Sequence, residues 1–555
     1  MNPRIGCLTA IALLPAVAAV AQPGDSYEAY RLNALRFSQI QATGTTRTQS
    51  MGGAGSALGA DLGAFVLNPA NLGTYRRSEF SLTPGLLLNS SESAAGLADK
   101  ARTGATDDGR NGFNIANLGV VFVTRKDDND GSDWRSGGLG INFSRLATVS
   151  NRRTYALAGL DSSRSIQEFI VQDFLLPGKG NGSIADVLTN ASASNNVILN
   201  FADLGYNAYL LNFQYDSANH PTGVFYTPTW GGTARQTETT TMRGAINQID
   251  IGYGASYRDK LFVGGSLGIV TARYEEQRIL TETLTNTNSD LVSLTVRDGY
   301  EVRGGGVNLR LGLVYRPNDY LRLGAAIQTP TFMSELKEQA EPITLSTVFR
   351  APFPAGSTNP VTTPSASIKE SEFSYSLTTP FRATGGLTLL GGKLGLISAD
   401  IDYVNYGSMR LSAVDNDPAG VSFQSANATM RREYASAVNV RIGGELRLKE
   451  FRLRAGYGHY GSPYADATRG GERTVIGGGV GIRREKGYVD VGFARTTYTA
   501  DLYRPYTLTT ANPVANPGPN DPAYLPYSAA TAAEPVVSTR YTLLNPTITI
   551  GFILQ

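Results

Sequence analysis

Cysteine and histidine are almost missing from this chain of 555 residues, which has one Cys and two His. The single cysteine, Cys7, excludes both a disulfide framework and a cysteine-based metal site. The two histidines, His220 and His459, are too few for a histidine-rich metal cluster or a haem protein. We therefore expect no metal and no cofactor.

Charge is also scarce. Charged residues make up 17% of the chain, whereas an ordinary soluble domain has about 25%. The 49 basic and 47 acidic residues leave a formal net charge of +2. Because so small a charge neither gathers nucleic acid nor steers an acidic substrate, we expect no nucleic-acid partner. Glycine, by contrast, is abundant, with 62 residues.

A long hydrophobic run is missing after the first 21 residues. Residues 1–21 have the pattern of a secretory signal peptide, with Arg4, an apolar run over 8–20 and the small-x-small triplet Ala19-Val20-Ala21. The alternatives are a membrane-spanning helix, for which the run falls short of about 20 residues, and lipid attachment at Cys7. We expect an exported protein that can enter a membrane only with strands.

Beyond residue 77 the dominant pattern is alternation of apolar and polar residues with period two. Leu309 and Leu311, for example, alternate with Asn308 and Arg310. Such segments are strands with one apolar face and one face of Gly, polar and charged residues. They suit either a soluble antiparallel sheet or a membrane barrel with its apolar face in lipid.

The connections between these strands favour the barrel. Short turns such as Arg258-Asp259 and Lys449-Glu450 alternate with long segments such as 150–231 and 502–538. Outer-membrane barrels have short periplasmic turns and long external loops, whereas a soluble sheet has no reason to keep its long loops at one end. We predict an all-β fold, a transmembrane antiparallel β-barrel of about 14 strands. The expected strands are 78–88, 112–125, 135–148, 234–257, 260–275, 297–316, 319–330, 371–390, 393–408, 430–448, 451–461, 472–484, 487–501 and 539–554.

The segment that precedes the first strand differs in composition. Gly44 to Arg77 is dense in Gly, Ala and Thr and lacks strand alternation, yet it has too many apolar residues for a solvated linker. A barrel of this width needs more than its own side chains to fill it. We therefore predict a signal peptide over 1–21, a plug or hatch inside the lumen over 22–77, and a barrel over 78–555 whose longest external loop is 150–231.

Two motifs in this leader carry a resemblance. Met51-Gly52-Gly53-Ala54, followed by Asn68-Pro69-Ala70-Asn71-Leu72-Gly73, resembles the N-terminal hatch of the long-chain fatty-acid transporter family, the FadL/TodX-like proteins. Asn71 stands where that family usually has Gly, and the terminal Gln555 replaces the usual aromatic residue. The resemblance implies passive uptake of hydrophobic small molecules, either long-chain fatty acids or aromatic hydrocarbons. It also implies hatch and gating roles for Met51, Gly52, Gly53, Asn68, Pro69, Ala70 and Asn71.

Charged residues of both signs point into the expected lumen. An ion-selective constriction would need a ring of one sign. We favour the other interpretation, in which the charges pair with one another and with an inserted segment. The predicted lumen network comprises Asp400, Asp402, Arg441, Glu445, Arg447, Arg452 and Arg454, with Asp250, Arg310, Arg322, Arg382 and Asp490 also inward.

Loop 150–231 contains three stretches with helical spacing. The first has Ile166, Phe169, Ile170 and Phe174 on one face, and the others lie near 183–188 and 201–211. Such helices could form an apolar groove that captures a ligand, or they could pack together as a cap. The residues do not separate these alternatives.

An enzymatic function is not indicated. His220 lies in a turn and His459 near the end of a strand, and no Gly-x-Ser-x-Gly motif stands between a strand and a helix. We expect no catalytic residues. The expected protein is a channel in a bacterial outer membrane for hydrophobic small molecules. Its partners would be that ligand, outer-membrane lipid and, during biogenesis, the barrel-assembly machinery. A general porin and a surface or secretion-associated barrel remain alternatives.

Overall fold

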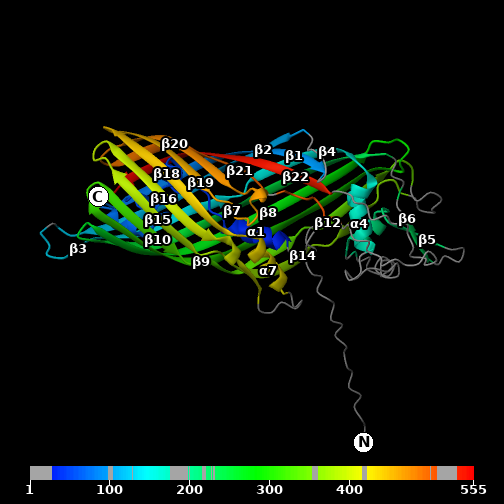
Figure 1. Ribbon diagram of the computed structural model, residues 1–555, viewed down its shortest axis with the longest axis horizontal. Coiled ribbons are helices and arrows are strands. Elements are labelled where there is room, and N and C mark those ends of the chain that lie inside the picture. Colours follow the sequence, from blue (N-terminus) through cyan, green and yellow to red (C-terminus); the bar gives the residue numbers. More distant parts are fainter. Residues whose placement is uncertain are drawn as a thin grey trace, which may run out of the picture.

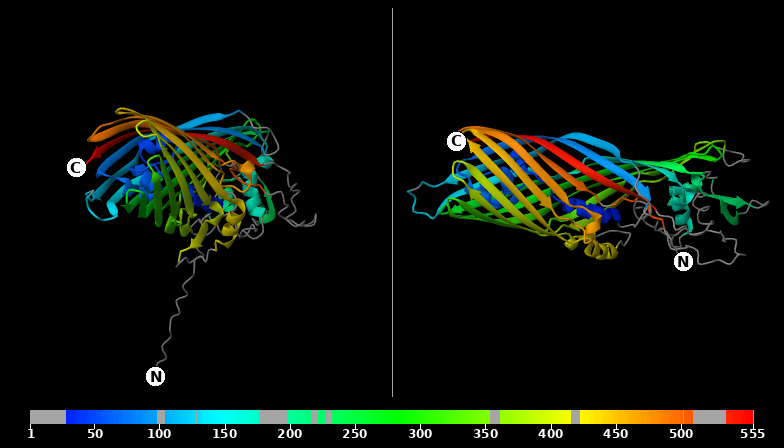
Figure 2. Two further views of the ribbon diagram at one scale, coloured as in Figure 1. Left: turned by 60° about the vertical axis from the view of Figure 1, so that its left-hand side comes forward. Right: turned by 45° about the horizontal axis from the view of Figure 1, so that its top comes forward.

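The computed structural model shows a closed antiparallel β-barrel with short helices inside it and at one end (Figures 1 and 2). It describes residues 28–97, 104–127, 129–175, 198, 200–215, 221–226, 228, 232–352, 361–414, 422–500, 502–508 and 534–554. The predicted signal peptide lies outside these residues. No helix in the described part of the chain is both long and apolar enough to cross a membrane.

Twenty strands form the barrel, and β5 and β6 form a separate hairpin. The strands are β1 Glu79–Leu97, β2 Thr106–Arg125, β3 Trp134–Thr148, β4 Asn151–Leu160, β5 Asn212–Tyr215, β6 Pro221–Tyr226, β7 Ala234–Tyr257, β8 Leu261–Leu284, β9 Leu291–Asn318, β10 Leu321–Gln328, β11 Phe332–Ala340, β12 Ile343–Phe349, β13 Ser365–Ile368, β14 Ser371–Thr378, β15 Arg382–Leu390, β16 Gly395–Asn405, β17 Arg410–Ala413, β18 Ser436–Leu448, β19 Phe451–Tyr460, β20 Arg473–Arg483, β21 Gly487–Thr499 and β22 Pro535–Ile553. The helices are α1 Glu28–Ser38, α2 Thr46–Ser50, α3 Leu62–Leu67, η1 Pro69–Thr74, η2 Ser162–Arg164, α4 Ile166–Leu175, α6 Phe201–Asn207, η3 Tyr406–Ser408, α7 Gln424–Glu433 and η4 Ala467–Arg469.

Several strands of the barrel wall are interrupted and continue in line as a second or third strand. β3 and β4 both pair with β7, while β10, β11 and β12 all pair with β9. When each interrupted strand is counted once, the wall has 14 strands, and β22 pairs with β1 to close it. The predicted barrel with an N-terminal plug is confirmed.

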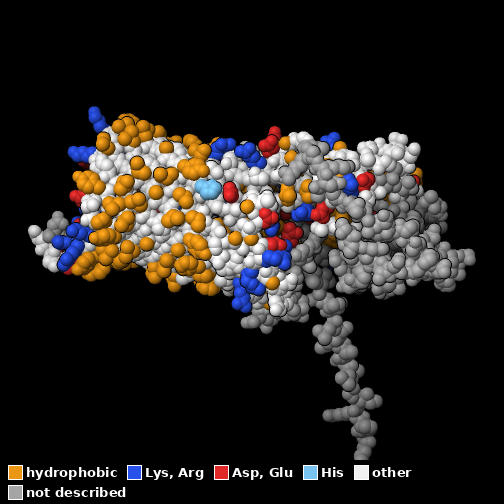
Figure 3. All heavy atoms as spheres, in the orientation of Figure 1, with side chains coloured by type: hydrophobic (Ala, Val, Ile, Leu, Met, Phe, Trp, Pro, Cys, Tyr) orange, Lys and Arg blue, Asp and Glu red, His pale blue; other side chains and the backbone are white. Residues whose placement is uncertain are grey.

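The barrel is apolar outside and polar inside. On β9, Leu311 is 60% exposed on the outer surface, whereas the neighbouring Arg310 is 4% exposed and faces the lumen. The exposed apolar residues belong to strands from β1 to β22 and so form a belt, which covers the part of the barrel near the C-terminus on the face shown in Figure 3. Because only lipid accommodates so large an apolar surface, this belt marks the membrane-spanning part.

The short turns lie beyond the belt at the same end as the C-terminus (Figure 1). Arg258 and Asp259 both have positive φ, 52° and 53°, as a two-residue hairpin turn requires. Asp133 and Arg125 pair with them at 2.8 Å and fix the turn against the neighbouring strands.

The opposite end is more regular than predicted. β7 and β8 have 24 residues and β9 has 28, whereas about 9–11 residues cross a membrane. Much of the chain between the expected strands, at 89–111, 279–296 and 336–368, is therefore strand that continues beyond the belt. We call this part the rim. The expected strand 430–448 is wrong at its start, because α7 occupies this segment and the strand begins at Ser436.

The rim has a conventional hydrophobic core. Its strands turn apolar residues inward around α4 and α6, which confirms two of the three helical stretches predicted in loop 150–231. The remaining stretch, 183–188, lies outside the described residues. Inside the barrel, α1, α2, α3 and η1 fill the lumen (Figure 2).

Candidate functional site

The hatch is seated against one side of the wall at Met51. Here the inner surface of the barrel consists of glycine, and the main chain of the hatch lies directly on it. A Cβ atom at Gly456 would lie 2.0 Å from the carbonyl carbon of Met51, and one at Gly443 would lie 2.5 Å from its oxygen. Gly52 and Gly53 follow with φ of 67° and 86°, a backbone that a side chain would strain.

A second seat lies at Asn68-Pro69. A Cβ atom at Gly312 would meet the Asn68 side chain at 1.9 Å, and one at Gly264 would meet Pro69 at 2.5 Å. The Asn68 amide donates to the carbonyl of Ser56 at 2.8 Å and to that of Leu313 at 3.1 Å. The segment is thus hydrogen-bonded both to the hatch and to the wall.

Asn71 ties two parts of the hatch together. Its Oδ1 accepts from the N–H of Gly59 at 3.0 Å, and its Nδ2 donates to the carbonyl of Ala64 at 3.0 Å. Ala70 is fully buried against Phe262 and Val314. The residues with predicted gating roles are therefore held both within the hatch and against the wall.

Ion pairs join the hatch to the wall. Glu445 accepts from Arg47 of the hatch at 2.8 Å, from Arg454 at 2.9 Å and from Arg447 at 3.0 Å. Arg454 also donates to Asp490 at 2.7 Å. Three arginines thus bond to Glu445 in the interior, and one of them, Arg454, also bonds to a second carboxylate.

Asp400, on the neighbouring strand β16, also joins the hatch to the wall. It accepts from the backbone N–H groups of Gly55 and Ser56, at 2.8 and 3.0 Å, and lies 3.7 Å from Arg441. Arg452 differs from the predicted network, because it donates to the carbonyls of Lys449 and Phe451 in its own turn.

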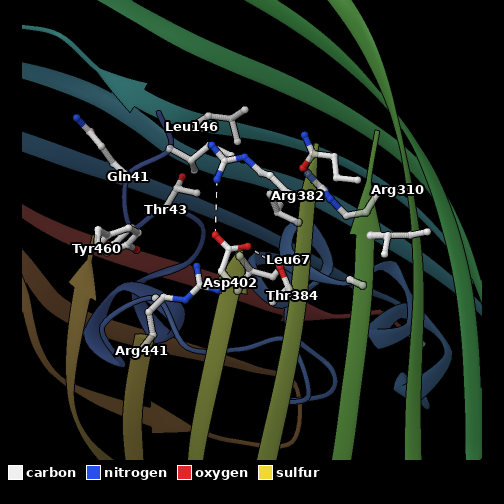
Figure 4. Close-up of a pocket in the computed structure, with 17 residues that line it drawn as sticks. Gln41, Thr43, Leu67, Leu146, Arg310, Arg382, Thr384, Asp402, Arg441 and Tyr460 are labelled. Carbon is white, nitrogen blue, oxygen red and sulfur yellow. Dashed lines mark hydrogen bonds and ion pairs between the residues drawn. The ribbon is translucent and has the colours of Figure 1, made fainter. Parts of the chain in front are cut away.

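A small void of about 50 Å³, lined by charged and apolar side chains, lies between the hatch and the wall (Figure 4). Asp402 accepts from Thr384 at 2.8 Å and lies 3.6 Å from Arg382, and Arg441 and Arg310 line the same void. Three arginines and one carboxylate line this void, and Asp250 and Asp400 lie 3.4 Å from Arg310 and 3.7 Å from Arg441. The arginines are therefore paired with carboxylates and do not form the one-sign ring of an ion-selective constriction.

The wall is not continuously hydrogen-bonded. β2 pairs with β3 only from Asn117 to Arg125. Beyond that point β4 pairs with β7 alone, so no strand among the described residues pairs with the edge of β2 over 106–116 on this side. We call this edge and the facing β4 the wall break.

The wall break arises because the chain steps inward between β3 and β4. The carbonyl of Ser150 accepts from Asn89, and that of Arg152 accepts from Ser91, both at 2.6 Å. Asn89 and Ser91 are on the inner face of β1. β4 therefore lies inside the wall, against a strand that is not its neighbour in the sheet.

Gln41 of the hatch bonds to the chain at this step. Its side chain donates to the carbonyl of Thr148 and accepts from the N–H of the same residue, both at 3.0 Å. Its own N–H donates to the carbonyl of Leu146 at 2.9 Å, and Thr43 donates to that of Arg145. Residues 41–43 thus make some of the backbone hydrogen bonds that a neighbouring strand would otherwise make with 145–148.

Two cavities meet at Gln41. One has a volume of about 240 Å³ and lies between α1, the wall and the β3–β4 step. The other, of about 30 Å³, lies beside the wall break. Gln41 and Thr148 line both, as do Thr496 and Leu543. These side chains therefore separate the larger interior cavity from the smaller one beside the wall break.

The residues predicted to capture ligand lie in the rim core. Ile166 and Ile170 are fully buried, and Phe169 packs edge-on against Phe201 of α6 at 5.3 Å between ring centroids. The side chain of Phe174 lies outside the described residues. Opening this cluster would be required before it could contact a ligand.

No group of three or more His, Cys, Asp or Glu residues within the described ranges is arranged to hold a metal ion. His459 is partly buried on β19, and His220 lies outside the described part of the chain.

The site and fold together define a plugged membrane barrel. No family model matches the sequence, and no curated protein matches it. A FadL homologue from Pseudomonas aeruginosa has a similar fold, with a TM-score of 0.51 and 11% identity over 93% of this chain and 100% of that one. The toluene transporters TbuX of Ralstonia pickettii (15% identity, TM-score 0.45, 94% and 100% coverage) and TodX of Pseudomonas putida (12%, 0.45, 93% and 98%) are also similar. The chain thus has a FadL-like fold, as the hatch motifs implied.

Two features of the site were missed from the sequence. The inward step at 149–150 follows a strand with ordinary alternation. The run Ala147-Thr148-Val149-Ser150-Asn151 contains no Gly or Pro, so it gives little sign that the strand is interrupted there. Gln41 lies in a segment without any periodic pattern.

Proposed function

We propose that this protein is a channel in a bacterial outer membrane for the passive uptake of small molecules with a hydrophobic body. The observation that carries the proposal is an interior cavity that adjoins a break in the barrel wall, in a lumen that a hatch otherwise fills. Such an arrangement suits a ligand that partitions into lipid, because the ligand can leave sideways into the membrane.

The proposed route has three stages. A ligand enters past the rim helices, occupies the cavity of about 240 Å³ beside α1, and leaves through the wall break. The firm seats at Met51 and Asn68 support a hatch whose main body stays in place. The movable part would then be residues 39–43 with Gln41, rather than the Asn68-Pro69 turn. No energy source enters this mechanism, since the ligand moves down its gradient.

Single-channel conductance in a planar bilayer tests the plug. We expect the purified full-length mature protein to be silent or to flicker, and a variant that lacks residues 28–76 to conduct steadily. A large, steady conductance of the intact protein would favour a porin and contradict the proposal.

Uptake tests the cargo and does not depend on a truncated chain. Loss of growth on a hydrophobic carbon source after deletion of the gene, restored by the intact protein, would support transport. Normal growth on fatty acids and aromatic compounds would instead favour a surface scaffold.

A further inference from the structure

The cavity beside α1 contains three arginines, and two of them have partners. Arg153 donates to Thr240 at 2.9 Å and lies 3.5 Å from Glu238. Arg36 bonds to Asn33, and its guanidinium lies 3.5 Å above the ring of Tyr274.

The third arginine, Arg473, is different. It is only 8% exposed and lines the cavity, yet within the described part of the chain its guanidinium makes no hydrogen bond and no ion pair. The guanidinium lies 5.0 Å from the centre of the Tyr460 ring and interacts with Tyr498. A buried cation without a carboxylate is unfavourable unless an anion completes the site.

The carboxylates around the cavity do not provide that anion. Glu276 accepts a hydrogen bond from Tyr274 and interacts with Arg36. Glu28 is at the exposed start of α1. One guanidinium in the cavity is therefore available to bind a ligand.

The walls of the cavity are aromatic as well as charged. Five tyrosines line it, Tyr300, Tyr464, Tyr498, Tyr503 and Tyr541. Tyr498 and Tyr541 stack with their centroids 5.2 Å apart. Tyrosine rings pack against an apolar or aromatic body, and arginine binds a carboxylate in a planar, two-point geometry.

The way out of the cavity is also cationic. Arg145 lines the void beside the wall break, and no carboxylate among the described residues pairs with it. At the outer mouth of the break, the three arginines Arg110, Arg152 and Arg243 lie near the carboxylates of Asp108 and Glu275. Arg152 lies 3.3 Å from Asp108, and Arg243 lies 3.8 Å from Glu275. A ligand with one negative charge finds an arginine at each stage.

We infer that the cavity binds a small aromatic carboxylate, with its carboxylate on Arg473 and its ring among the tyrosines. This inference rests on the proposed function and names the class of its cargo. A neutral hydrocarbon would leave Arg473 without a partner, and an ammonium compound would repel it.

Three probes of nearly equal shape test the charge preference: benzoate, toluene and benzylamine. We expect isothermal titration calorimetry on the full mature protein in detergent to show benzoate binding at least tenfold more tightly than the other two. Arg473→Gln should weaken benzoate binding about tenfold and leave toluene unchanged. Arg473→Lys should keep the order of the three probes, and Arg495→Gln, on the exposed outer face of β21, should change nothing.

Each other result overturns a defined statement. If toluene binds as tightly as benzoate, or if Arg473→Gln leaves benzoate binding unchanged, the carboxylate site is wrong while the channel for hydrophobic compounds stands. If none of the three probes binds, and if deletion of the gene leaves growth on fatty acids and aromatic compounds normal, both the inference and the proposed function fail.

Discussion

One strand, β9, passes through two regions of the molecule that are organised in opposite ways. In the belt, Leu309 and Leu311 face outward and Asn308 and Arg310 face inward. In the rim, the outward positions become charged, as at Arg303, while the inward ones become apolar. The backbone phase does not change between the two regions.

The difference shows where the membrane ends. Lipid requires apolar side chains outside, and the interior at that level can then be polar because ion pairs and hydrogen bonds satisfy it. Water surrounds the rim, so the rim strands bury their apolar side chains as a soluble protein does. The hatch occupies the polar interior, and the rim helices occupy the apolar one.

The largest expected effect comes from the ion pairs of the belt interior. Glu445→Gln would leave Arg47 and Arg454 short of a carboxylate in a buried site. We expect unfolding in urea from liposomes to show a loss of about 3 kcal/mol. The matched control is Asp319→Asn, which breaks an exposed pair with Arg316 and should cost less than about 0.5 kcal/mol. Equal losses in both variants would contradict an interior held by ion pairs.

The second effect tests the outer surface. Leu311→Arg puts a charge into the lipid belt and should cost about 2–4 kcal/mol in the same unfolding experiment. Arg303→Leu, on the same face of the same strand, makes the opposite change in the rim. Because Arg303 is exposed there, we expect a change within about 0.5 kcal/mol. A strongly stabilising Arg303→Leu would place the membrane boundary further out than we infer, because it would remove a charge from lipid.

The sequence predicted the belt well and the rim poorly, for a physical reason. Alternation with apolar residues such as Leu309 and Leu311 marks a lipid-facing strand, and the prediction of about 14 strands follows from it. The plug follows from the composition of 44–77. In the rim, outward residues such as Arg303 are polar, so the strands resemble loops in sequence. The same phase with apolar residues inward, as at Leu294 and Val296, was the signal that could have shown them.

The candidate site was harder to predict because it depends on contacts between distant segments. The inward charges Glu445 and Asp400 follow from strand phase, but their hatch partners Arg47 and Gly55 do not. The residues with conspicuous motifs, Met51 and Asn68, are seats of the hatch. The contact at the wall break is made by Gln41, which no motif marks.

A third prediction concerns this contact between the hatch and the wall. Gln41→Ala removes two hydrogen bonds to Thr148, worth about 1.4 kcal/mol together, which corresponds to a tenfold change in an equilibrium. We expect the open fraction in single-channel records to rise about tenfold, with stability otherwise little changed. The control is Gln39→Ala. Gln39 lines the same cavity, and its side chain makes no hydrogen bond to the described part of the chain. An unchanged open fraction in Gln41→Ala would exclude residues 39–43 as the movable part.

The smallest expected effect is the pH dependence of the stability of α4, in the apolar core of the rim. Burial on α4 raises the pKa of Glu168 from its ordinary value of 4.5 to about 6, although Gln172 donates a hydrogen bond to it. Because the folded pKa is the higher one, the stabilisation of α4 is complete below about pH 4.5 and is lost as the pH rises through about 6. Amide hydrogen exchange, corrected for its intrinsic pH dependence, should therefore show α4 opening more readily at pH 7.5 than at pH 5. Glu168→Gln should abolish this difference, and a difference that persists in that variant would assign the pH response to another group of the rim.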